Sequence, residues 1–428
     1  MDGPPARRME LQSQAAARAQ KVDKKKRDRL LICIFYQKMA KYKSKLGESG
    51  MLLDFEVKNF FSFKEGVKIS FRVSDSCPTE FSKGKDYVNV LGIKGANGSG
   101  KTNVLRAFAF LNNFCTKSFS HDPGHLIGIK PFFNSKRPAE FRVDFVANGV
   151  NYLYTLAVDN NKVHSETLHR KLKRKTKLFE RVGDQVLEAT EEFAPLRAMK
   201  LRSNASIISI AHHHEIPLTK DVHSFFAPWY SNVTYGGLNN GPSIYAIAES
   251  LRDIPDYLDF VRNFISSCDG GVSDIKIKEV VREDGDKVLV PMFIHAHEGK
   301  AHSISHVTES SGTKALFKYL FFYKAILDTG GVLVLDEFDI TLHPHILPKL
   351  LDLFDNPETN PNGAQMIFST HNGDVLDWLG RYRCYLVNKE DNESYVYRLD
   401  ELPSDILRNG RPIAPAYNRG DLGGVPKL

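Results

Sequence analysis

Residues 95–102 read Gly-Ala-Asn-Gly-Ser-Gly-Lys-Thr and directly follow an apolar run at 88–93. This is a complete G-x-x-x-x-G-K-[ST] pattern. In such a pattern a strand leads into a glycine loop, and the backbone N–H groups of the loop bind phosphates at the N-terminus of a helix. We therefore predict a nucleoside triphosphate site here, with its helix over 101–114.

The fixed positions of this loop have separate chemical roles. Gly95 and Gly100 supply backbone freedom and a close approach that a Cβ would block. Lys101 would reach the β- and γ-phosphates of the nucleotide, and Thr102 offers a hydroxyl to Mg²⁺. The residues expected to bind ATP at this loop are Gly95, Asn97, Gly98, Ser99, Gly100, Lys101, Thr102 and Asn103.

The composition is that of an ordinary globular protein. The chain has 428 residues, of which 42% are hydrophobic and 25% charged, and this length predicts about two or three domains. The five scattered cysteines show no Cys-x-x-Cys spacing, so neither a disulfide framework nor a zinc site is indicated. No apolar run approaches the about 18 residues of a membrane helix. We expect a cytoplasmic protein without a membrane partner.

The net charge of +7 is concentrated at the start of the chain. Residues 1–50 hold 13 Lys and Arg against 5 Asp and Glu, whereas the remainder holds 45 against 46. One interpretation is a basic arm that binds nucleic acid. The alternative, which we favour, is a disordered or weakly helical extension, for which translation from an upstream start, with Met51 as the natural beginning, is one explanation.

The order of apolar patterns predicts an α/β fold with three lobes. Residues 51–190 should form an N-terminal lobe that contains the phosphate loop and an antiparallel β subdomain with Asn-Gly and Asn-Asn turns. Residues 191–270 should form a helical insert or lid, with one amphipathic helix over 243–266. Residues 271–428 should form the C-terminal lobe.

A second apolar strand ends in two carboxylates. Residues 332–335 are continuously apolar, as in a central parallel strand, and Asp336 and Glu337 follow them. Ligands of open α/β sheets bind at the C-terminal edge of the strands, so Asp336 should lie near the metal and Glu337 near the attacking water. We take Glu337 as the general base. An acidic turn without function is the alternative for an isolated Asp-Glu pair.

Two further segments extend this site. The apolar strand at 366–370 ends at His371, which should contact the γ-phosphate or orient the water. Upstream, Ser310, Ser311 and Gly312 begin a helix over 311–327, so hydroxyls and exposed N–H groups gather at a helix end that suits anions. Alone, that segment is only a good helix N-cap.

These elements, in this order, resemble the ABC ATPase heads of the structural-maintenance, RecF and OLD group. Residues 309–313 look like a divergent signature motif, 57–63 like the first-strand motif, and 336–344 like an extended Walker B segment. With Gly423 and Gly424, the resemblance covers most of 51–428. It is closest to stand-alone AAA/ABC-type ATPases of bacterial abortive-infection and restriction-linked loci (AbiL/RloA-like).

The resemblance implies an α/β P-loop NTPase with an ABC ATPase-like head, a mixed sheet, an antiparallel β subdomain and a helical insert. It also implies a head-to-tail homodimer, or a higher oligomer, that encloses ATP and Mg²⁺. In it Ser310, Ser311 and Gly312 of one subunit would bind the γ-phosphate held by the other, with Asp339 at the seam. By the same match Asp336 supports the metal, and the catalytic residues are Glu337, His371 and Lys101.

Two departures from that pattern stand out. Residues 130–134 read Lys-Pro-Phe-Phe-Asn where a metal-sensing glutamine is expected, and Ser311 and Thr313 replace the usual glycine and glutamine of transporter signatures. Metal sensing by the first segment is therefore in question.

Two other patterns are weaker. The histidines at 212–214 lack the i, i+4 spacing of a helical metal site. Lysines at 171, 173, 175 and 177 would share one face of a strand and could follow a phosphate backbone, but lysines also protect sheet edges, which we favour.

The leading hypothesis is an Mg²⁺-dependent ATPase whose nucleotide-driven dimerisation regulates a partner effector, such as a nuclease or toxin, in antiphage defence. A second hypothesis is an ATPase clamp of the RecF and structural-maintenance type that acts on DNA, or on RNA, in repair or recombination. A transporter subunit is least favoured, because the glutamine loop and the usual signature are missing.

Overall fold

The computed structural model describes residues 50–425 except 83, 218, 240, 282–284, 404–405 and 409, together with Ile32. The predicted basic extension at 1–50 therefore lies almost entirely outside the described residues. The described chain divides into two compact units, a larger one of residues 50–239 and 326–425 and a smaller one of residues 241–325. Among the described residues, no helix is long and apolar enough to cross a membrane.

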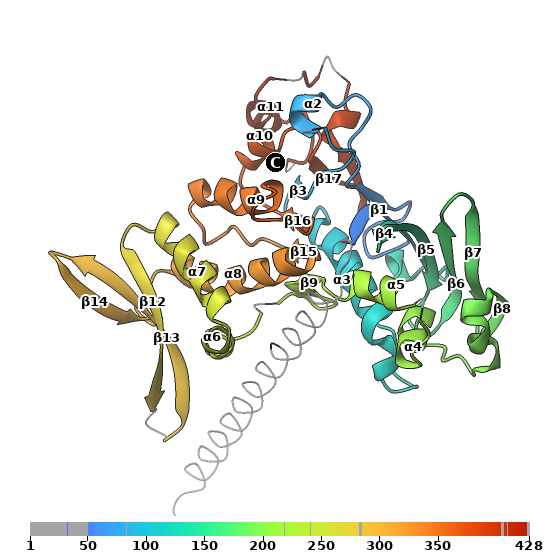
Figure 1. The fold of residues 1–428 in the computed structure, drawn as a ribbon. Helices are drawn as coiled ribbons and strands as arrows, with labels where there is room; N and C mark the ends of the chain where they lie inside the picture. The colour runs from blue at the N-terminus through green and yellow to red at the C-terminus, as the bar shows by residue number, and fades with distance from the viewer. Residues whose placement is uncertain are drawn as a thin grey trace, which may run out of the picture. The chain divides into compact units, whose positions relative to one another are not determined.

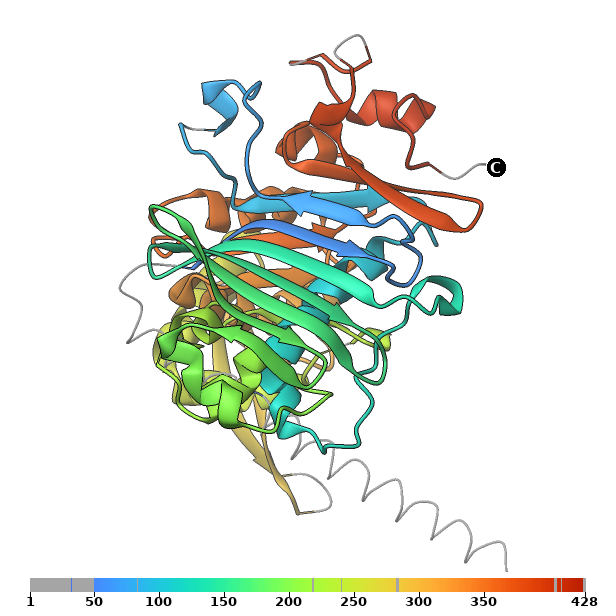
Figure 2. The same ribbon diagram turned by 90° about the vertical axis from the view of Figure 1, so that its right-hand side faces the viewer.

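The first sheet of the larger unit is antiparallel throughout and has the strand order β2-β1-β4-β5-β6-β7-β8 (Figure 2). Its burial alternates along the strands, as in β4, because successive side chains point to opposite faces. The predicted Asn-Gly turn lies between β4 and β5, with positive φ at Asn148 and Gly149. The strands are β1 (Met51–Lys58), β2 (Val67–Ser70), β4 (Ala139–Ala147), β5 (Val150–Val158), β6 (Val163–Lys171), β7 (Lys175–Val182) and β8 (Gln185–Ala189).

The second sheet has the order β18-β17-β3-β16-β15-β9, and only the β17–β18 pair is antiparallel. Strands β3, β15 and β16 are buried along their whole length, which explains their continuous apolar sequences. The strands are β3 (Val90–Gly95), β9 (Tyr230–Ser231), β15 (Val332–Leu335), β16 (Gln365–Ser369), β17 (Cys384–Glu390) and β18 (Glu393–Arg398).

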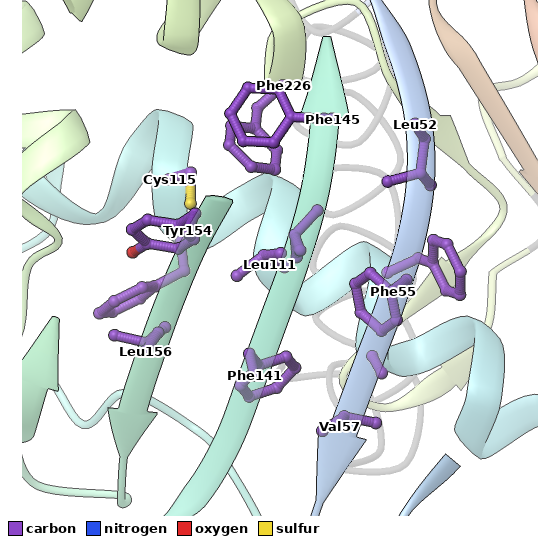
Figure 3. Close-up of a cluster of buried hydrophobic side chains, with 14 of the residues drawn as sticks. Leu52, Phe55, Val57, Leu111, Cys115, Phe141, Phe145, Tyr154, Leu156 and Phe226 are labelled. Carbon is purple, nitrogen blue, oxygen red and sulfur yellow. The ribbon is translucent and has the colours of Figure 1, made fainter. Parts of the chain in front are cut away.

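Helix α3 (Lys101–Lys117) packs against both sheets. Phe108 of α3 stacks on Phe55 of β1 with ring centroids 4.0 Å apart. Figure 3 shows Leu111 and Cys115 of α3 among the buried side chains of β1, β4 and β5. The short helices α4 (Ile207–His213) and α5 (Thr219–Phe226) pack on α3 as well. The helix that starts at the phosphate loop is therefore the centre of the core.

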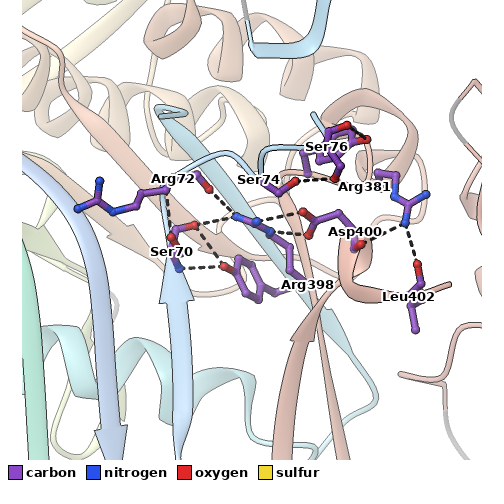
Figure 4. Close-up of polar contacts among 10 residues, drawn as sticks. Ser70, Arg72, Ser74, Ser76, Arg381, Arg398, Asp400 and Leu402 are labelled. Atoms are coloured by element: carbon purple, nitrogen blue, oxygen red, sulfur yellow. Dashed lines mark hydrogen bonds and ion pairs between the residues drawn. The ribbon is translucent and has the colours of Figure 1, made fainter. Parts of the chain in front are cut away.

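Polar contacts join the two sheets. The buried Gln365 side chain of β16 accepts from the Leu52 N–H at 2.7 Å and donates to the Leu52 carbonyl at 2.9 Å. Arg398 of β18 donates to the Arg72 carbonyl beside β2 at 2.7 Å and pairs with Asp400 at 2.6 Å (Figure 4). These bonds fix the sheet that carries the phosphate loop against the antiparallel sheet.

Three helices complete the larger unit near the chain's end, and Figure 1 labels each of them. They are α9 (Leu347–Asp355), α10 (Val375–Leu379) and α11 (Ala414–Arg419).

The smaller unit contains α6 (Ile244–Asp253), α7 (Pro255–Cys268) and a three-stranded antiparallel sheet. Its strands are β12 (Val272–Val281), β13 (Lys287–His297) and β14 (Lys300–Ser305), and α8 (Ser311–Thr329) begins in this unit. The prediction of one helix over 243–266 is wrong: the chain leaves helical geometry at Ile254, because the residue before a proline is pushed out of the α region. The predicted helical stretch 191–270 is divided between the two units, with α4 and α5 in the larger one.

Replacing Phe108 by alanine should destabilise the protein by about 3–5 kcal/mol, because the ring is fully buried and its removal leaves a cavity between α3 and β1. Urea unfolding followed by circular dichroism would measure the loss. Leu187→Ala, at a residue 54% exposed in β8, is the control and should change the stability by less than about 0.5 kcal/mol. Equal effects of the two substitutions would contradict this account of the core.

Candidate nucleotide site

The phosphate loop has the backbone geometry that its glycines predict. Strand β3 ends at Gly95 and α3 begins at Lys101, with φ of 75° at Gly98 and 118° at Gly100. A Cβ on Gly95 would lie 2.3 Å from the Val387 carbonyl oxygen. Only glycine allows β17 to pass this close to the loop.

Lys101 is buried and folds back on its own loop. Its Nζ donates to the carbonyl oxygens of Gly95 at 2.9 Å and Ala96 at 3.1 Å. Burial lowers the pKa of Lys101, while the carboxylates of Glu337 and Asp336 act in the opposite direction. An ammonium with only neutral acceptors in a buried position is suited to binding an anion.

Asp336 lies at the end of β15 with both carboxylate oxygens hydrogen-bonded. The Thr102 hydroxyl donates to Oδ2 at 2.7 Å, and the Ser369 hydroxyl of β16 donates to Oδ1. Its backbone is held by Asn232, which accepts from the Asp336 N–H at 2.7 Å and donates to the Asp336 carbonyl at 2.9 Å. This arrangement brings together Thr102 and Asp336, the two residues predicted to bind the metal.

Glu337 and His371 lie side by side beyond Asp336. The Nε2 atom of His371 is 3.2 Å from Oε1 of Glu337, and the Glu337 N–H donates to the Ser369 hydroxyl at 3.0 Å. Glu337 has a φ of 48°, an uncommon conformation for a residue with a side chain, and such strain is concentrated at functional sites. Both side chains are partly exposed.

One cavity of about 580 Å³ collects most of the predicted residues. Such a volume lies within the range of small-molecule sites. Its lining residues are Asn97, Gly98, Gly100, Lys101, Thr102, Asn103, Glu337, Ile340 and His371.

Sequence reasoning missed the residues that support this site. The Ser394 hydroxyl of β18 donates to the Ser99 carbonyl at 2.6 Å and lies 2.8 Å from the Ser62 hydroxyl, and Ser62 also accepts from Asn103 at 2.9 Å. Ser62 belongs to the first-strand motif, so a signal for it was present. Asn232 follows a strand of two residues in a stretch that reads as helical, and no pattern identified it.

The segment 130–134 packs on the end of the first-strand motif. The Phe61 N–H donates to the Lys130 carbonyl at 2.9 Å, and the Asn59 side chain accepts from the Phe132 N–H at 3.2 Å. Phe133 is 70% exposed.

The signature-like motif lies in the smaller unit, where Ser310 is the N-cap of α8. Its hydroxyl accepts from the Thr313 N–H at 3.0 Å, and the Thr313 hydroxyl donates to Asp269 at 2.9 Å. Glu309 is held by the Ser310 N–H at 2.7 Å and by His295 at 2.9 Å. The loop before Ser311 is thus fixed by contacts within its own unit.

The histidines at 212–214 lie at the end of α4, where the His212 ring stacks on His223 with centroids 3.5 Å apart. In the part of the chain that the structure describes, no group of three histidine, cysteine or carboxylate side chains could hold a metal ion.

The parallel sheet, the glycine loop and the helix behind it define a P-loop NTPase fold. The chain belongs to the family described as "AAA domain, putative AbiEii toxin, Type IV TA system", which matches residues 90–377, more than half of its length. A comparison with curated proteins gives no match.

Similar solved structures include the SMC head domain from Thermotoga maritima, which is 16% identical with a TM-score of 0.39 and covers 81% of this chain and 98% of that chain. The Smc head domain of Pyrococcus furiosus, bound to the C-terminal domain of ScpA, is 14% identical with a TM-score of 0.39. This match covers 82% of this chain and 97% of that chain. An Smc head bound to the C-winged helix domain of ScpA is 17% identical with a TM-score of 0.40. This match covers 81% of this chain and 96% of that chain.

Replacing Asn232 by alanine should lower the free energy of unfolding by about 2–4 kcal/mol, because the buried N–H and carbonyl of Asp336 each lose a partner. Urea unfolding would measure the change. Asn161→Ala, at an exposed turn residue, is the matched control. A stability loss no larger than that of the control would show that Asn232 does not hold the end of β15.

Proposed function

We propose that this protein binds ATP with Mg²⁺ and hydrolyses it to ADP and phosphate. The observation that carries the proposal is that Thr102 and Glu337 line the cavity of the phosphate loop, and that Thr102 donates to the buried carboxylate of Asp336. Thr102 and Asp336 would hold Mg²⁺, whose preferred ligands are oxygens. Membership of the AAA-domain family supports the assignment.

The catalytic roles follow from the same geometry. Lys101 would leave the Gly95 and Ala96 carbonyls for the β- and γ-phosphates, a stronger, charge-assisted interaction. Glu337 would accept a proton from the attacking water. His371, 3.2 Å from Glu337, would contact the γ-phosphate and orient that water.

The proposed active form is a head-to-tail homodimer or a higher oligomer. Ile340 is 63% exposed at the nucleotide cavity, and Asp339, the buried residue before it in the chain, would lie at the predicted seam. Ser311 is exposed and Gly312 half-buried in the first turn of α8, where backbone N–H groups have no partner within the helix. From a second subunit, these groups and Ser310 would meet the γ-phosphate.

Nucleotide-dependent dimerisation would regulate a partner effector, such as a nuclease or toxin, in antiphage defence. Support for this finer proposal is the family's description, which names a type IV toxin–antitoxin system, and the resemblance to AbiL/RloA-like ATPases. The effector would bind the ATP-closed form and be released on hydrolysis.

Glu337→Gln should lower kcat for ATP at least about 100-fold, because the general base is lost while the charge-independent contacts remain. Lys101→Ala should instead abolish ATP binding. Phosphate release and titration with a fluorescent ATP analogue would measure the two effects, with the exposed Glu358→Gln as the control. Parental hydrolysis rates in both variants would refute the assignment.

The Glu337→Gln protein also tests the dimer and the effector. With ATP and Mg²⁺ it should elute as a dimer in size-exclusion chromatography with light scattering, and with ADP it should not. Affinity capture from the native host with ATP should retain an effector that the ADP sample lacks. A monomer that binds ATP would contradict the dimer.

A second candidate function, a clamp on DNA, is favoured by the β6–β7 hairpin. Its tip, residues 171–175, reads Lys-Leu-Lys-Arg-Lys, and all five side chains are exposed. None of the ion pairs among the described residues includes a cation of this tip. Other exposed cations of the same sheet do have carboxylate partners, such as Lys68 with Glu56 at 3.8 Å.

The structure weakens the alternative that these lysines protect a sheet edge. Strand β8 pairs with β7 and is itself the edge, and Lys177 pairs with Glu180 and Glu188. The exposed cations of the tip would neutralise backbone phosphates of DNA.

Replacing the four tip cations by glutamine should weaken duplex DNA binding and reduce the slope of log K against log salt by about 2–4, at about 0.9 per lost phosphate contact. Fluorescence anisotropy between 50 and 200 mM salt, roughly the range in which such contacts dominate, would measure it. A control with the same charge change replaces exposed lysines 68, 85, 162 and 200. Equal slopes in both variants would rule out the hairpin as the DNA contact.

A further inference from the structure

Lys94 is a buried lysine directly before the phosphate loop. It lies in β3, and only 5% of its surface is exposed. Its Nζ donates to the carbonyl oxygen of His371 at 2.8 Å and lies 4.9 Å from the centre of the Tyr417 ring. Lys94 does not line the nucleotide cavity. Its ammonium therefore contacts the backbone of His371 without entering the cavity.

The charge of Lys94 is poorly compensated. The charged and titratable groups that face it are Asp339, Lys101, Cys384, Asp374 and the Tyr417 ring. No carboxylate pairs with it within 4.0 Å in the described part of the larger unit. Burial lowers its pKa to about 8, Asp339 opposes this change, and Lys101 adds to it. A buried ammonium without an ion pair is unfavourable for folding, which points to a role in the site.

The position of His371 depends on two bonds to β3. The Thr370 N–H donates to the Ile93 carbonyl at 3.1 Å, and Lys94 holds the His371 carbonyl. Rotation of the peptide after His371 is thereby restricted, and the imidazole is directed at Glu337, 3.2 Å away. A misplacement of about 1 Å in such a contact can cost about 100-fold in rate.

We propose that Lys94 is a positioning residue for the proposed ATPase reaction, whose ammonium holds His371 in the orientation that meets Glu337 and the nucleotide. The inference rests on the proposed function. Lys94 acts through His371 and does not itself touch the nucleotide.

The ammonium has a defined pH window. It is present below pH about 8 and is lost as the pH rises through this value. A neutral amine makes a weaker hydrogen bond than an ammonium, so His371 is held less firmly above pH 8. In the unfolded chain the lysine keeps its ordinary pKa near 10.5. Below pH 8 the lysine is charged in both states, and its burial lowers the free energy of unfolding. This loss of stability becomes smaller as the pH rises from 8 to 10.5, because the folded lysine is then already neutral.

The test compares Lys94→Met and Lys94→Arg with the parent in kcat and KM for ATP from pH 6.5 to 9.5. We expect an alkaline fall of kcat near pH 8 in the parent. Lys94→Met should have at least tenfold lower kcat at pH 7, no alkaline fall, and KM within threefold of the parent. Lys94→Arg should keep its activity above pH 9, because guanidinium stays charged. Exposed Lys389→Met is the matched control.

A second readout does not need hydrolysis. The NMR signals of the His371 ring can be assigned in histidine-labelled protein by comparison with a His371→Gln variant. Their chemical shifts should differ between Lys94→Met and the parent, and they should change as the pH passes 8 in the parent only. The melting temperature of Lys94→Met at pH 7 should not fall, because a buried charge is removed. Unchanged His371 signals, or a parental pH profile in Lys94→Met, would overturn the inference. Absence of ATP hydrolysis in the parent would instead refute the proposed function.

Discussion

The buried carboxylate of Asp336 joins four segments that are distant in the sequence. It accepts hydroxyl protons from Thr102 of α3 and Ser369 of β16, while Asn232, beside β9, holds its backbone. Burying a carboxylate in an apolar sheet costs free energy unless its oxygens accept hydrogen bonds. The N-terminus of α3 and the C-terminal ends of three parallel strands must therefore meet at Asp336. The phosphate loop follows from this, because α3 begins where Thr102 can reach Asp336.

This constraint also explains why the core is organised around α3. The helix must keep one end at the carboxylate and pack its length between two sheets, and Phe108 stacked on Phe55 fixes it laterally. The sheets in turn need a connection, which Gln365 and Arg398 provide through backbone carbonyls and N–H groups. Stability and site geometry therefore depend on the same few elements.

The sequence predicts the parts of the site in which a buried apolar strand ends in a polar residue. Strands β3, β15 and β16 are continuous apolar runs, so the ends that carry the loop, Asp336 and His371 could be placed together. Asn232 could not, because a two-residue strand has no periodicity and its amide recognises only backbone atoms. Likewise, a helical period continues across Pro255, and the division of the stretch 191–270 depends on packing with distant segments.

Two buried lysines border the phosphate loop, and in the proposed ATPase their mutual repulsion would link nucleotide binding at the loop to the position of His371. Lys94 holds the His371 carbonyl, Lys101 holds the loop's own carbonyls, and Lys101 is one of the charges that lower the pKa of Lys94. Phosphates bound at the loop would offset the charge of Lys101 and favour the ammonium form of Lys94. Because such coupling is reciprocal, a firmly held His371 would favour the bound nucleotide by the same free energy. In the proposed ATPase, strand β3 would thereby connect nucleotide binding to His371.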